Sequence, residues 1–264
     1  MSPSREIELL NPTHSESEVC KTNVAVSESE PQTQWEKVVT TRWGKYITSI
    51  ERQAILKAQG LFEKPTTALE VGSEGGRWTK LLDSLGWEMT CTDVNPEVLR
   101  MCQARVPRAR CILVSSNGET LPCETASLDL LVCIEVLPVA QSEWFASEAS
   151  RVLRPQGVLV TMVSNSLSVR GCAYRVFTAF DTNRKQFRDE SGIYSTTYRS
   201  WRKRLNEAGF GVKHEEGMCW LPFSRESNSP LIPPLTRLEQ ALGLRRLIAL
   251  SPSVVLIARK TDHT

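Results

Sequence analysis

The feature of this sequence that most constrains its fold is the alternation of short apolar runs with helical segments between residues 67 and 164. Five apolar runs are predicted to form strands: "TALEVG" (67–72), "EMTCTDV" (88–94), "RCILVSS" (110–116), "SLDLLVCIEV" (127–136) and "GVLVTMVS" (157–164). Helical spacing is found between them at 76–86, 95–106 and 142–154. Continuous apolar strands that alternate with helices are typical of a parallel sheet covered on both faces. The sequence therefore predicts an α/β, doubly wound sheet.

The flanking segments differ from this pattern. Residues 1–33 are rich in Ser, Glu, Pro, Thr and Asn, and they are expected to form a disordered tail because they cannot bury enough apolar surface. Residues 35–62 have helical spacing. In the last third, helices are predicted at 166–180, 196–210 and 235–250, and strands at 209–220 and 253–260.

The composition excludes several classes of protein. The formal net charge of +2 is too small to indicate nucleic-acid binding. No apolar run reaches the roughly 18 residues of a membrane span, and the N-terminus lacks the apolar core of a signal peptide. The eight cysteines contain no C-x-x-C pair and only three histidines are present, so no metal site is expected. Reduced cysteines packed as small apolar groups indicate a cytoplasmic protein.

The stretch "LEVGSEGGRW" (69–78) follows the first predicted strand directly. Open parallel sheets bind ligands beyond the carboxyl ends of their strands, and glycines there let the backbone come close to a ligand. Asp93 ends the second predicted strand, about 20 residues further along, where its carboxylate can accept hydrogen bonds from a ribose diol. An alternative role for Asp93 is to cap the next helix, but Asn95 can already do this. These two features fit several nucleotide-like cofactors.

A third segment distinguishes between those cofactors. "SSNGETLPCETASLDLLVCIEVL" (115–137) and "ASEASRVLRPQGVLVTMV" (146–163), taken with "LEVGSEGGRW", resemble the class I S-adenosylmethionine-dependent methyltransferases of the type 11-like group. The resemblance covers residues 35–165 well and the final strands more loosely. It implies a Rossmann-like, mostly parallel seven-stranded sheet with an antiparallel last strand and helical insertions.

The resemblance also implies a division of the chain into parts. Residues 34–264 are expected to form a single methyltransferase domain. Lid helices would occupy 34–62 and the cofactor-binding core 65–165, with substrate-side insertions at 166–208 and 221–250.

The resemblance also implies which residues bind the cofactor, S-adenosyl-L-methionine. The loop after the first strand would face its methionine part, Asp93 would hold the ribose, and Val94 would lie against the adenine. Asn117 and Gly118 would meet the adenine edge, and Ile134 and Glu135 would lie near the departing methyl group. The expected cofactor-binding residues are thus Glu70, Gly72, Ser73, Glu74, Gly76, Asp93, Val94, Asn117, Gly118 and Ile134.

Three departures from the family pattern affect the expected chemistry. Glu74 stands where a glycine is usual, and Asn117 replaces an acidic residue but can still accept a hydrogen bond from an amino group. Glu74 could face the positively charged cofactor or could simply be a solvated loop residue. No histidine lies in the loop directly after the fourth strand, so Glu135 is the candidate catalytic base or positioning group, with a structural or cofactor-side role as its alternative.

The acceptor site is expected to come from the late insertions. The segment 221–234 and its surroundings supply Trp220, Arg225 and Asn228, a combination that suits a small-molecule, lipid or glycan-type acceptor with an apolar body and an anionic or hydroxylated end. An ordinary surface loop is the alternative. The helices at 166–180 and 235–250 carry arginines beside apolar residues, which permits peripheral membrane contact as well as packing on the sheet.

Two other functions remain open at this stage. A non-catalytic cofactor-binding protein of methyltransferase fold would explain Glu74 and the missing histidine. An NAD-dependent oxidoreductase would require a G-x-G-x-x-G loop and a Tyr-x-x-x-Lys dyad, and the sequence has G-S-E-G-G and no such dyad. The sequence does not decide the acceptor or the oligomeric state.

Overall fold

The computed structural model describes residues 32–179, 186 and 190–261. The described residues belong to one compact unit. The predicted disordered tail therefore lies almost wholly outside the described residues. No helix in the described part of the chain is long and apolar enough to cross a membrane.

The centre of the unit is a seven-stranded sheet, as the sequence predicts. Its strands lie in the order β3-β2-β1-β4-β5-β7-β6, and β7 runs antiparallel to both of its neighbours while the other contacts are parallel. The strands are β1 (Thr67–Val71), β2 (Glu88–Asp93), β3 (Arg110–Leu113), β4 (Leu128–Cys133), β5 (Leu153–Ser164), β6 (Phe210–Met218) and β7 (Ser253–Lys260). The order reverses between β1 and β4, so the carboxyl ends of these two strands form the switch point where ligands bind in such sheets.

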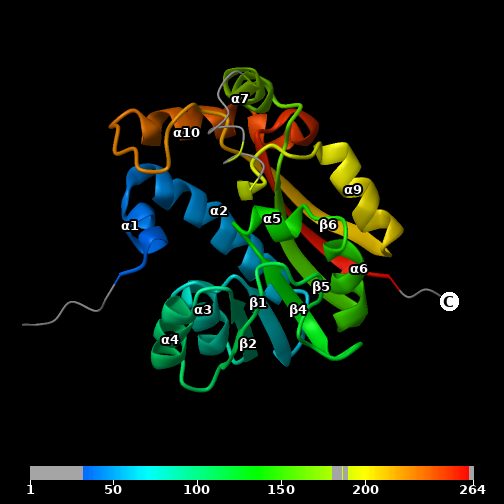
Figure 1. Cartoon of the computed structure of the whole chain (residues 1–264). Helices are drawn as coiled ribbons and strands as arrows, with labels where there is room; N and C mark the ends of the chain where they lie inside the picture. Colours follow the sequence, from blue (N-terminus) through cyan, green and yellow to red (C-terminus); the bar gives the residue numbers. More distant parts are fainter. Residues whose placement is uncertain (1–31, 180–185, 187–189, 262–264) are drawn as a thin grey trace, which may run out of the picture. The chain divides into compact units, whose positions relative to one another are not determined.

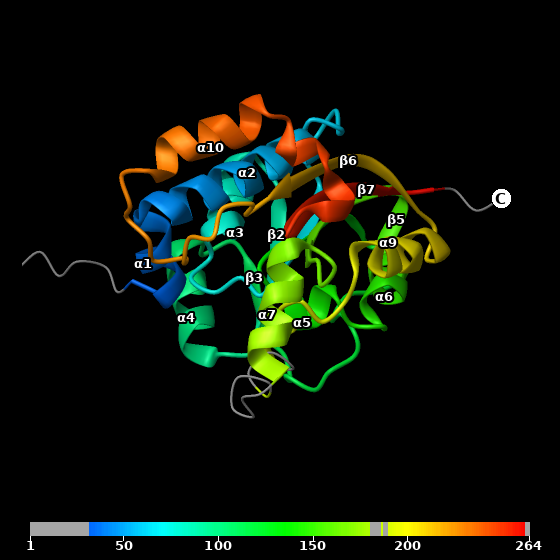
Figure 2. The same cartoon turned by 90° about the horizontal axis from the view of Figure 1, so that it is seen from above.

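Helices cover both faces of the sheet (Figures 1 and 2). They are α1 (Gln34–Thr40), α2 (Arg42–Gln59), α3 (Arg77–Ser84), α4 (Pro96–Arg105), α5 (Leu137–Ala140), α6 (Phe145–Val152), α7 (Val169–Ala179), α9 (Tyr198–Glu207) and α10 (Ile232–Ala241), followed by the 3-10 turns η1 (Leu244–Arg246) and η2 (Ile248–Leu250). One apolar core lies between the sheet and α2, α3 and α4, and a second lies between the sheet and α6 and α9. Neighbouring strand residues such as Leu130 and Leu131 belong to opposite cores, because successive side chains point to opposite faces.

Local sequence signals explain most helix boundaries. The Asn95 side chain accepts a hydrogen bond from the backbone N–H of Glu97 at 2.9 Å, and Pro96 occupies the first turn of α4, as predicted. The helix expected at 142–154 is shorter than predicted. It ends at Val152 because Leu153 turns to an extended conformation and begins β5.

The segment predicted as one helix over 235–250 is divided. Helix α10 ends at Ala241, and Gly243 follows in the left-handed conformation, with φ of 67°. A continuous α-helix cannot pass through such a residue. The chain therefore continues as two short 3-10 turns, which bring it back to β7.

Substitution of Gly76 would test how tightly the loop after β1 is packed, with Gly243 as the comparison. Gly76 and Gly243 both have positive φ, of 82° and 67°. A Cβ atom at Gly76 would lie 2.6 Å from Cys102 Sγ, whereas a Cβ atom at Gly243 would have nothing within 4 Å. We expect Gly243→Ala to cost about 1 kcal/mol in unfolding free energy from backbone strain alone, and Gly76→Ala to cost about 2–4 kcal/mol because overpacking adds to it.

Chemical denaturation of both variants measures this difference. Equal losses of unfolding free energy in the two variants would contradict the close contact between the loop and α4.

Candidate functional site

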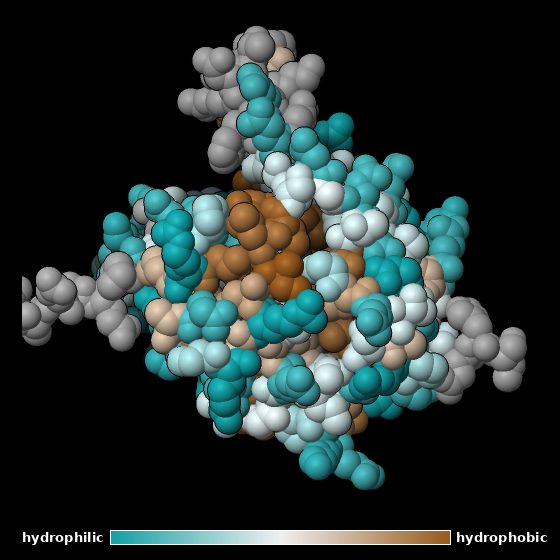
Figure 3. Space-filling view, turned by 60° about the horizontal axis from the view of Figure 1, so that its bottom comes forward, coloured by the Kyte–Doolittle hydropathy of each residue, from teal (hydrophilic) through white to brown (hydrophobic). Residues whose placement is uncertain are grey.

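A cavity of about 620 Å³ opens at the carboxyl ends of β1, β2 and β4. This volume lies within the range of small-molecule sites. Figure 3 shows one face of the molecule, on which apolar side chains gather in one area with hydrophilic side chains around it. The cavity lining likewise combines apolar walls with a few charged groups. The lining residues are Trp35, Glu70, Val71, Gly72, Ser73, Glu74, Arg77, Trp78, Thr92, Asp93, Val94, Val114, Ser115, Ser116, Gly118, Thr120, Leu121, Pro122, Ile134, Glu135, Val136, Pro138, Val139, Trp144 and Arg225.

The loop between β1 and α3 forms one wall of this cavity. The backbone N–H groups of Gly72 and Ser73 both donate to the carbonyl of Thr92, at 2.8 and 2.9 Å, which bends the loop over the end of β2. Gly72 has φ of 69°, and a Cβ atom there would lie 2.4 Å from Val136 Cγ2. The glycine is therefore required both by the backbone conformation and by the close approach of the loop after β4.

Asp93 joins the two loops beside the cavity. Its Oδ2 accepts a hydrogen bond from the backbone N–H of Glu74 at 2.8 Å, and its Oδ1 accepts one from the backbone N–H of Asn95 at 2.9 Å. The carboxylate is thereby fixed in orientation. Each carboxylate oxygen can accept a further hydrogen bond, so Asp93 can also bind two hydroxyl groups of a ligand.

Glu70 is a buried carboxyl group at the end of β1, only 3% exposed. Thr79 Oγ1 donates a hydrogen bond to its Oε2 at 2.5 Å. Burial raises the pKa of Glu70 to about 8, although the bond from Thr79 opposes this shift. Glu70 therefore keeps its proton to a higher pH than an exposed carboxyl group does, and a cationic ligand would favour its ionised form.

The side chain of Glu74 makes a specific contact in this loop. It adopts a positive φ of 48°, the conformation for which glycine is usual. Its Oε1 accepts a hydrogen bond from the backbone N–H of Trp35 at 3.0 Å, in the first turn of α1. A carboxylate at a helix N-terminus is favoured by the unpaired N–H groups and the helix dipole. Glu74 thus fastens α1 over the cavity.

A second contact, with α4, also holds α1 in place. Arg105 of α4 pairs with Glu36 at 2.5 Å and donates to the carbonyl of Gly75 at 2.8 Å. Burial opposes ionisation of Glu36, but Arg105 and the backbone N–H of Thr33 outweigh it and hold the pKa of Glu36 below its usual value. The helix is therefore attached to both the β1–α3 loop and α4.

Tryptophan rings and guanidinium groups alternate at one end of the cavity. Arg77 lies 4.0 Å from the ring centre of Trp78 and 5.5 Å from that of Trp35, and Arg225 lies 4.9 Å from Trp35. Such cation–π contacts hold both the rings and the guanidinium groups in fixed positions. Trp35 Nε1 and Trp78 Nε1 are buried and have no hydrogen-bond partner in the described part of the chain.

Two glutamates lie beside these two guanidinium groups. Glu135, with a positive φ of 63°, pairs with Arg225 at 2.6 Å, and Arg77 pairs with the fully buried Glu51 at 3.2 Å. The Arg225 side chain is 45% exposed, which is consistent with its place along the open cavity. Its neighbour Glu135 raises the pKa of Arg225, so this guanidinium stays charged. Burial, followed by repulsion from Glu135, raises the pKa of Glu51 to about 8.

The predicted acceptor residues are only partly brought together. Arg225 lines the cavity, but Trp220 and Asn228 do not. Asn228 instead accepts a hydrogen bond from the backbone N–H of Arg42 at 3.0 Å, at the start of α2. Thr41 also donates a hydrogen bond to the Arg225 carbonyl at 2.9 Å. The loop at 221–230 is therefore attached to the junction of α1 and α2.

The predicted cofactor residues gather more completely. Glu70, Gly72, Ser73, Glu74, Asp93, Val94, Gly118, Ile134 and Glu135 line the cavity, whereas Gly76 and Asn117 do not. Gly76 begins α3 as its left-handed N-terminal cap, and Asn117 is exposed beside Ser116 and Gly118. The sequence did not indicate Arg77 and Trp144, which line the cavity, or Glu51, which pairs with Arg77, because no local pattern says which side chains of a helix or a distant loop come to the site.

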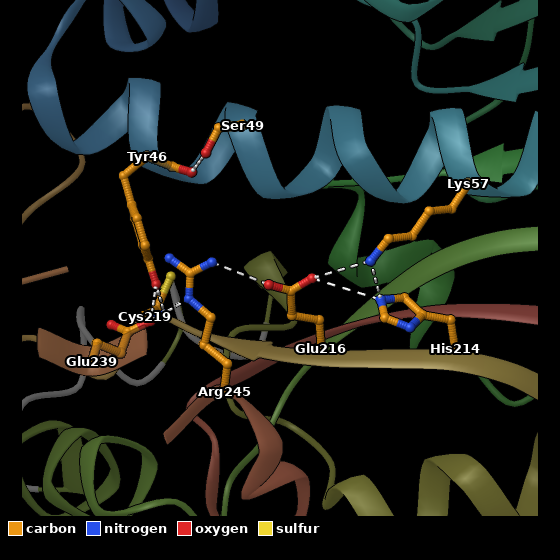
Figure 4. Close-up of polar contacts among 8 residues, drawn as sticks. All are labelled: Tyr46, Ser49, Lys57, His214, Glu216, Cys219, Glu239 and Arg245. Carbon is orange, nitrogen blue, oxygen red and sulfur yellow. Dashed lines mark hydrogen bonds and ion pairs between the residues drawn. The ribbon is translucent and has the colours of Figure 1, made fainter. Parts of the chain in front are cut away.

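A polar network outside the cavity connects α2 to α10 and β6 (Figure 4). Tyr46 donates a hydrogen bond to Glu239 at 2.6 Å, and Arg245 bridges Glu239 and Glu216, both at 3.1 Å. Tyr46 Oη also accepts from the backbone N–H of Cys219 at 3.2 Å. Tyr46, which lies in the segment 34–62 expected to form lid helices, therefore connects α2 to α10 and to the chain just after β6.

Three cysteine thiols also meet, between β2, β3 and α4. Cys91 Sγ lies 3.0 Å from Cys111 Sγ and 3.5 Å from Cys102 Sγ. They pack within the apolar core beside Leu99 and Val106. This packing agrees with their expected role as small apolar groups.

The buried Glu70 predicts a specific dependence of stability on pH. The unfolded carboxyl group ionises near its ordinary pKa of 4.5, whereas the folded one keeps its proton until about pH 8. Folding therefore binds a proton between these values, and the unfolding free energy falls as pH rises through this window, by about 1.4 kcal/mol for each unit of difference. Glu70→Gln should flatten this decline.

Urea denaturation between pH 4.5 and pH 9 would check this prediction, with the exposed Glu88→Gln as the control. Parallel pH profiles for wild type and Glu70→Gln would exclude a protonated Glu70.

Comparison with known proteins adds family information to this geometry. Residues 69–161 match the family model described as a methyltransferase domain. An uncharacterized methyltransferase-like protein of Schizosaccharomyces pombe is 30% identical over 105 residues, which are 38% of this chain and 38% of that protein. The chain thus matches less than half the length of this relative.

Solved structures share the fold at low sequence identity. An S-adenosylmethionine-dependent methyltransferase from Methanosarcina mazei covers 78% of this chain and 97% of its own, with 16% identity and a TM-score of 0.54. One from Mesorhizobium loti covers 77% and 95%, with 14% identity and a TM-score of 0.52. The [4+2]-cyclase SpnF covers 81% of both chains, with 16% identity and a TM-score of 0.54.

Proposed function

We propose that this chain is an S-adenosylmethionine-dependent methyltransferase acting on a small-molecule, lipid or glycan-type acceptor, because residues 69–161 match the family model of a methyltransferase domain. The observation that carries the proposal is the cavity in which Glu70, Asp93 and the glycine loop meet at the switch point of the sheet. Binding at this position is typical of doubly wound folds.

The residues of the cavity fit this cofactor. Asp93, fixed by two backbone N–H groups, would hold the ribose hydroxyls, and the exposed Val94 would lie against the adenine. Gly72, whose left-handed backbone brings the loop close, would leave room for the methionine part. When bound, S-adenosylmethionine supplies an electrophilic methyl group on a positively charged sulfur.

The charge of the cavity favours a cationic cofactor. The carboxyl groups of Glu74, Asp93 and Glu135 line it, together with the buried carboxyl group of Glu70, whose pKa is raised, against two guanidinium groups. Both guanidinium groups are already paired, Arg77 with Glu51 and Arg225 with Glu135. A dinucleotide would bring a negatively charged pyrophosphate to this loop, whereas S-adenosylmethionine brings an ammonium and a sulfonium group. This balance supports a methyl donor over NAD.

The protein's part in methyl transfer would be to position the acceptor. In-line displacement depends mainly on holding the nucleophile close to the methyl group at the correct angle. Trp35, Arg225 and Glu135 form the end of the cavity where an acceptor would lie. Arg225 neutralises Glu135 and holds it in place, so we assign Glu135 to positioning the acceptor. A hydroxyl or anionic group of the methyl-accepting substrate could donate a hydrogen bond to Glu135 or accept one from Arg225.

Cofactor binding can be tested by thermal denaturation. S-adenosylmethionine should raise the melting temperature of the wild type, and NAD should not. We expect Asp93→Asn to weaken S-adenosylmethionine binding by about 10- to 100-fold, because one charge-assisted hydrogen bond to a ribose hydroxyl is lost. Asp83→Asn, which alters a surface aspartate paired with Arg108, is the control. Stabilisation by NAD alone, or unchanged affinity in Asp93→Asn, would exclude this assignment.

Methyl transfer can be tested separately. Transfer of a radiolabelled methyl group from S-adenosylmethionine to cell-extract fractions should occur with the wild type. It should fall about 10- to 1,000-fold in Arg225→Gln and Glu135→Gln, while cofactor affinity changes less than threefold. Arg108→Gln serves as the control. A wild type that binds the cofactor tightly but labels no fraction would favour the non-catalytic alternative.

A further inference from the structure

Exposed apolar side chains are concentrated on two segments of the chain. Of the twelve large apolar residues that are exposed in the described part of the chain, nine fall within residues 167–179 and 231–250. They are Leu167, Val169, Val176, Phe177, Leu231, Leu238, Leu242, Leu247 and Leu250. Val169 is 83% exposed and Phe177 is 72% exposed. The predicted packing of these helices against the sheet therefore buries only a small part of their apolar surface.

The two segments belong to one face, which we call the upper face and define as residues 167–179 and 231–250. Helices α7 and α10 and the η1–η2 turns lie at the top of Figure 1 and face the viewer in Figure 2. A hydrogen bond places η2 beside the start of α7: Asn165, just before α7, donates to the carbonyl of Ala249 in η2 at 2.9 Å. Many exposed apolar side chains on one side of a protein, with polar groups around them, mark an interaction site.

The charges of the upper face have a single sign. Arg175, Arg237 and Arg246 are exposed, and no ion pair to these three is found among the described residues. Glu239 is the sole acidic residue in the two segments, and it is only 2% exposed because it is paired with Tyr46 and Arg245. Helices that lie in the headgroup region of a membrane have this composition: leucine, valine and phenylalanine beside arginine, without exposed acidic residues.

The same charges argue against self-association. A twofold contact between two copies of the upper face would bring arginines against arginines with no exposed carboxylate of that face to neutralise them. An anionic bilayer surface provides both the apolar layer and the negative charge that this face lacks. We propose that the upper face docks on the surface of an anionic membrane, with α7 and α10 lying in the plane of the headgroups.

The upper face is connected directly to the wall of the cavity. Arg170 of α7 donates hydrogen bonds to the carbonyls of Leu221 and Phe223, both at 3.1 Å. Two residues later the same loop places Arg225 in the cavity. Docking of α7 thus acts on the segment that carries Arg225. The inference concerns binding alone and does not depend on methyl transfer.

Sedimentation with lipid vesicles tests the inference on the full chain. We expect the wild type to sediment with vesicles of equal parts phosphatidylglycerol and phosphatidylcholine, more weakly with phosphatidylcholine alone, and less as salt rises. Replacing Arg175, Arg237 and Arg246 together by Gln should weaken partitioning by about 100-fold, or about fivefold for each arginine. The matched control replaces the exposed Arg100, Arg108 and Arg199 by Gln and should leave partitioning unchanged.

A second pair of variants tests the apolar contribution. Phe177→Ser with Leu242→Ser should weaken binding to both kinds of vesicle at least tenfold, whereas Leu113→Ser, an exposed leucine on β3, should not. Unchanged melting temperatures would show that the variants remain folded.

Three results would overturn the inference. One is a wild type that does not sediment with the anionic vesicles. Another is an equal loss of binding in the arginine variant and its control. The third is a wild-type oligomer in solution that Phe177→Ser with Leu242→Ser converts to a monomer, because the upper face would then be an interface between copies of the chain.

Discussion

The carboxylate of Asp93 is the group on which the architecture of the site depends. It accepts hydrogen bonds from the backbone of Glu74 and of Asn95, and so joins the loop after β1 to the loop after β2. The Glu74 side chain then continues the connection to α1 through the Trp35 N–H. Two carboxylates, Asp93 and then Glu74, thus accept hydrogen bonds from backbone N–H groups. These contacts set the position of the β1–α3 loop and of α1 beside the cavity.

A second constraint is that two carboxyl groups are buried beside the cavity. Glu51 and Glu70 are almost completely buried, and burial raises the pKa of both to about 8. Buried carboxyl groups at this position are costly unless they are neutral or meet a positive charge. Arg77 partly meets that need for Glu51. A cationic ligand would do the same for Glu70, so the burial of this carboxyl group is consistent with the positive charge of the proposed cofactor.

The cavity and the upper face are linked through one loop. Arg170 holds the carbonyls of Leu221 and Phe223, and Thr41 holds the carbonyl of Arg225. The segment that carries Arg225 is therefore attached to α7 on one side and to the α1–α2 junction on the other. A ligand or surface that moves either of these elements would also move the guanidinium group that pairs with Glu135.

The sequence by itself determined the order of the strands and helices, the glycine loop and Asp93 at the end of β2. These features depend on contacts within a few residues, and the period of apolar side chains reports them directly. The sequence did not indicate the partners of Glu74, the pairing of Glu135 with Arg225 ninety positions away, or the meeting of three cysteines from β2, β3 and α4. Only the tertiary structure decided these, because which distant side chains meet depends on the packing of whole elements. The exposure of α7 has the same cause: an apolar helix looks alike in sequence whether it covers a core or a surface.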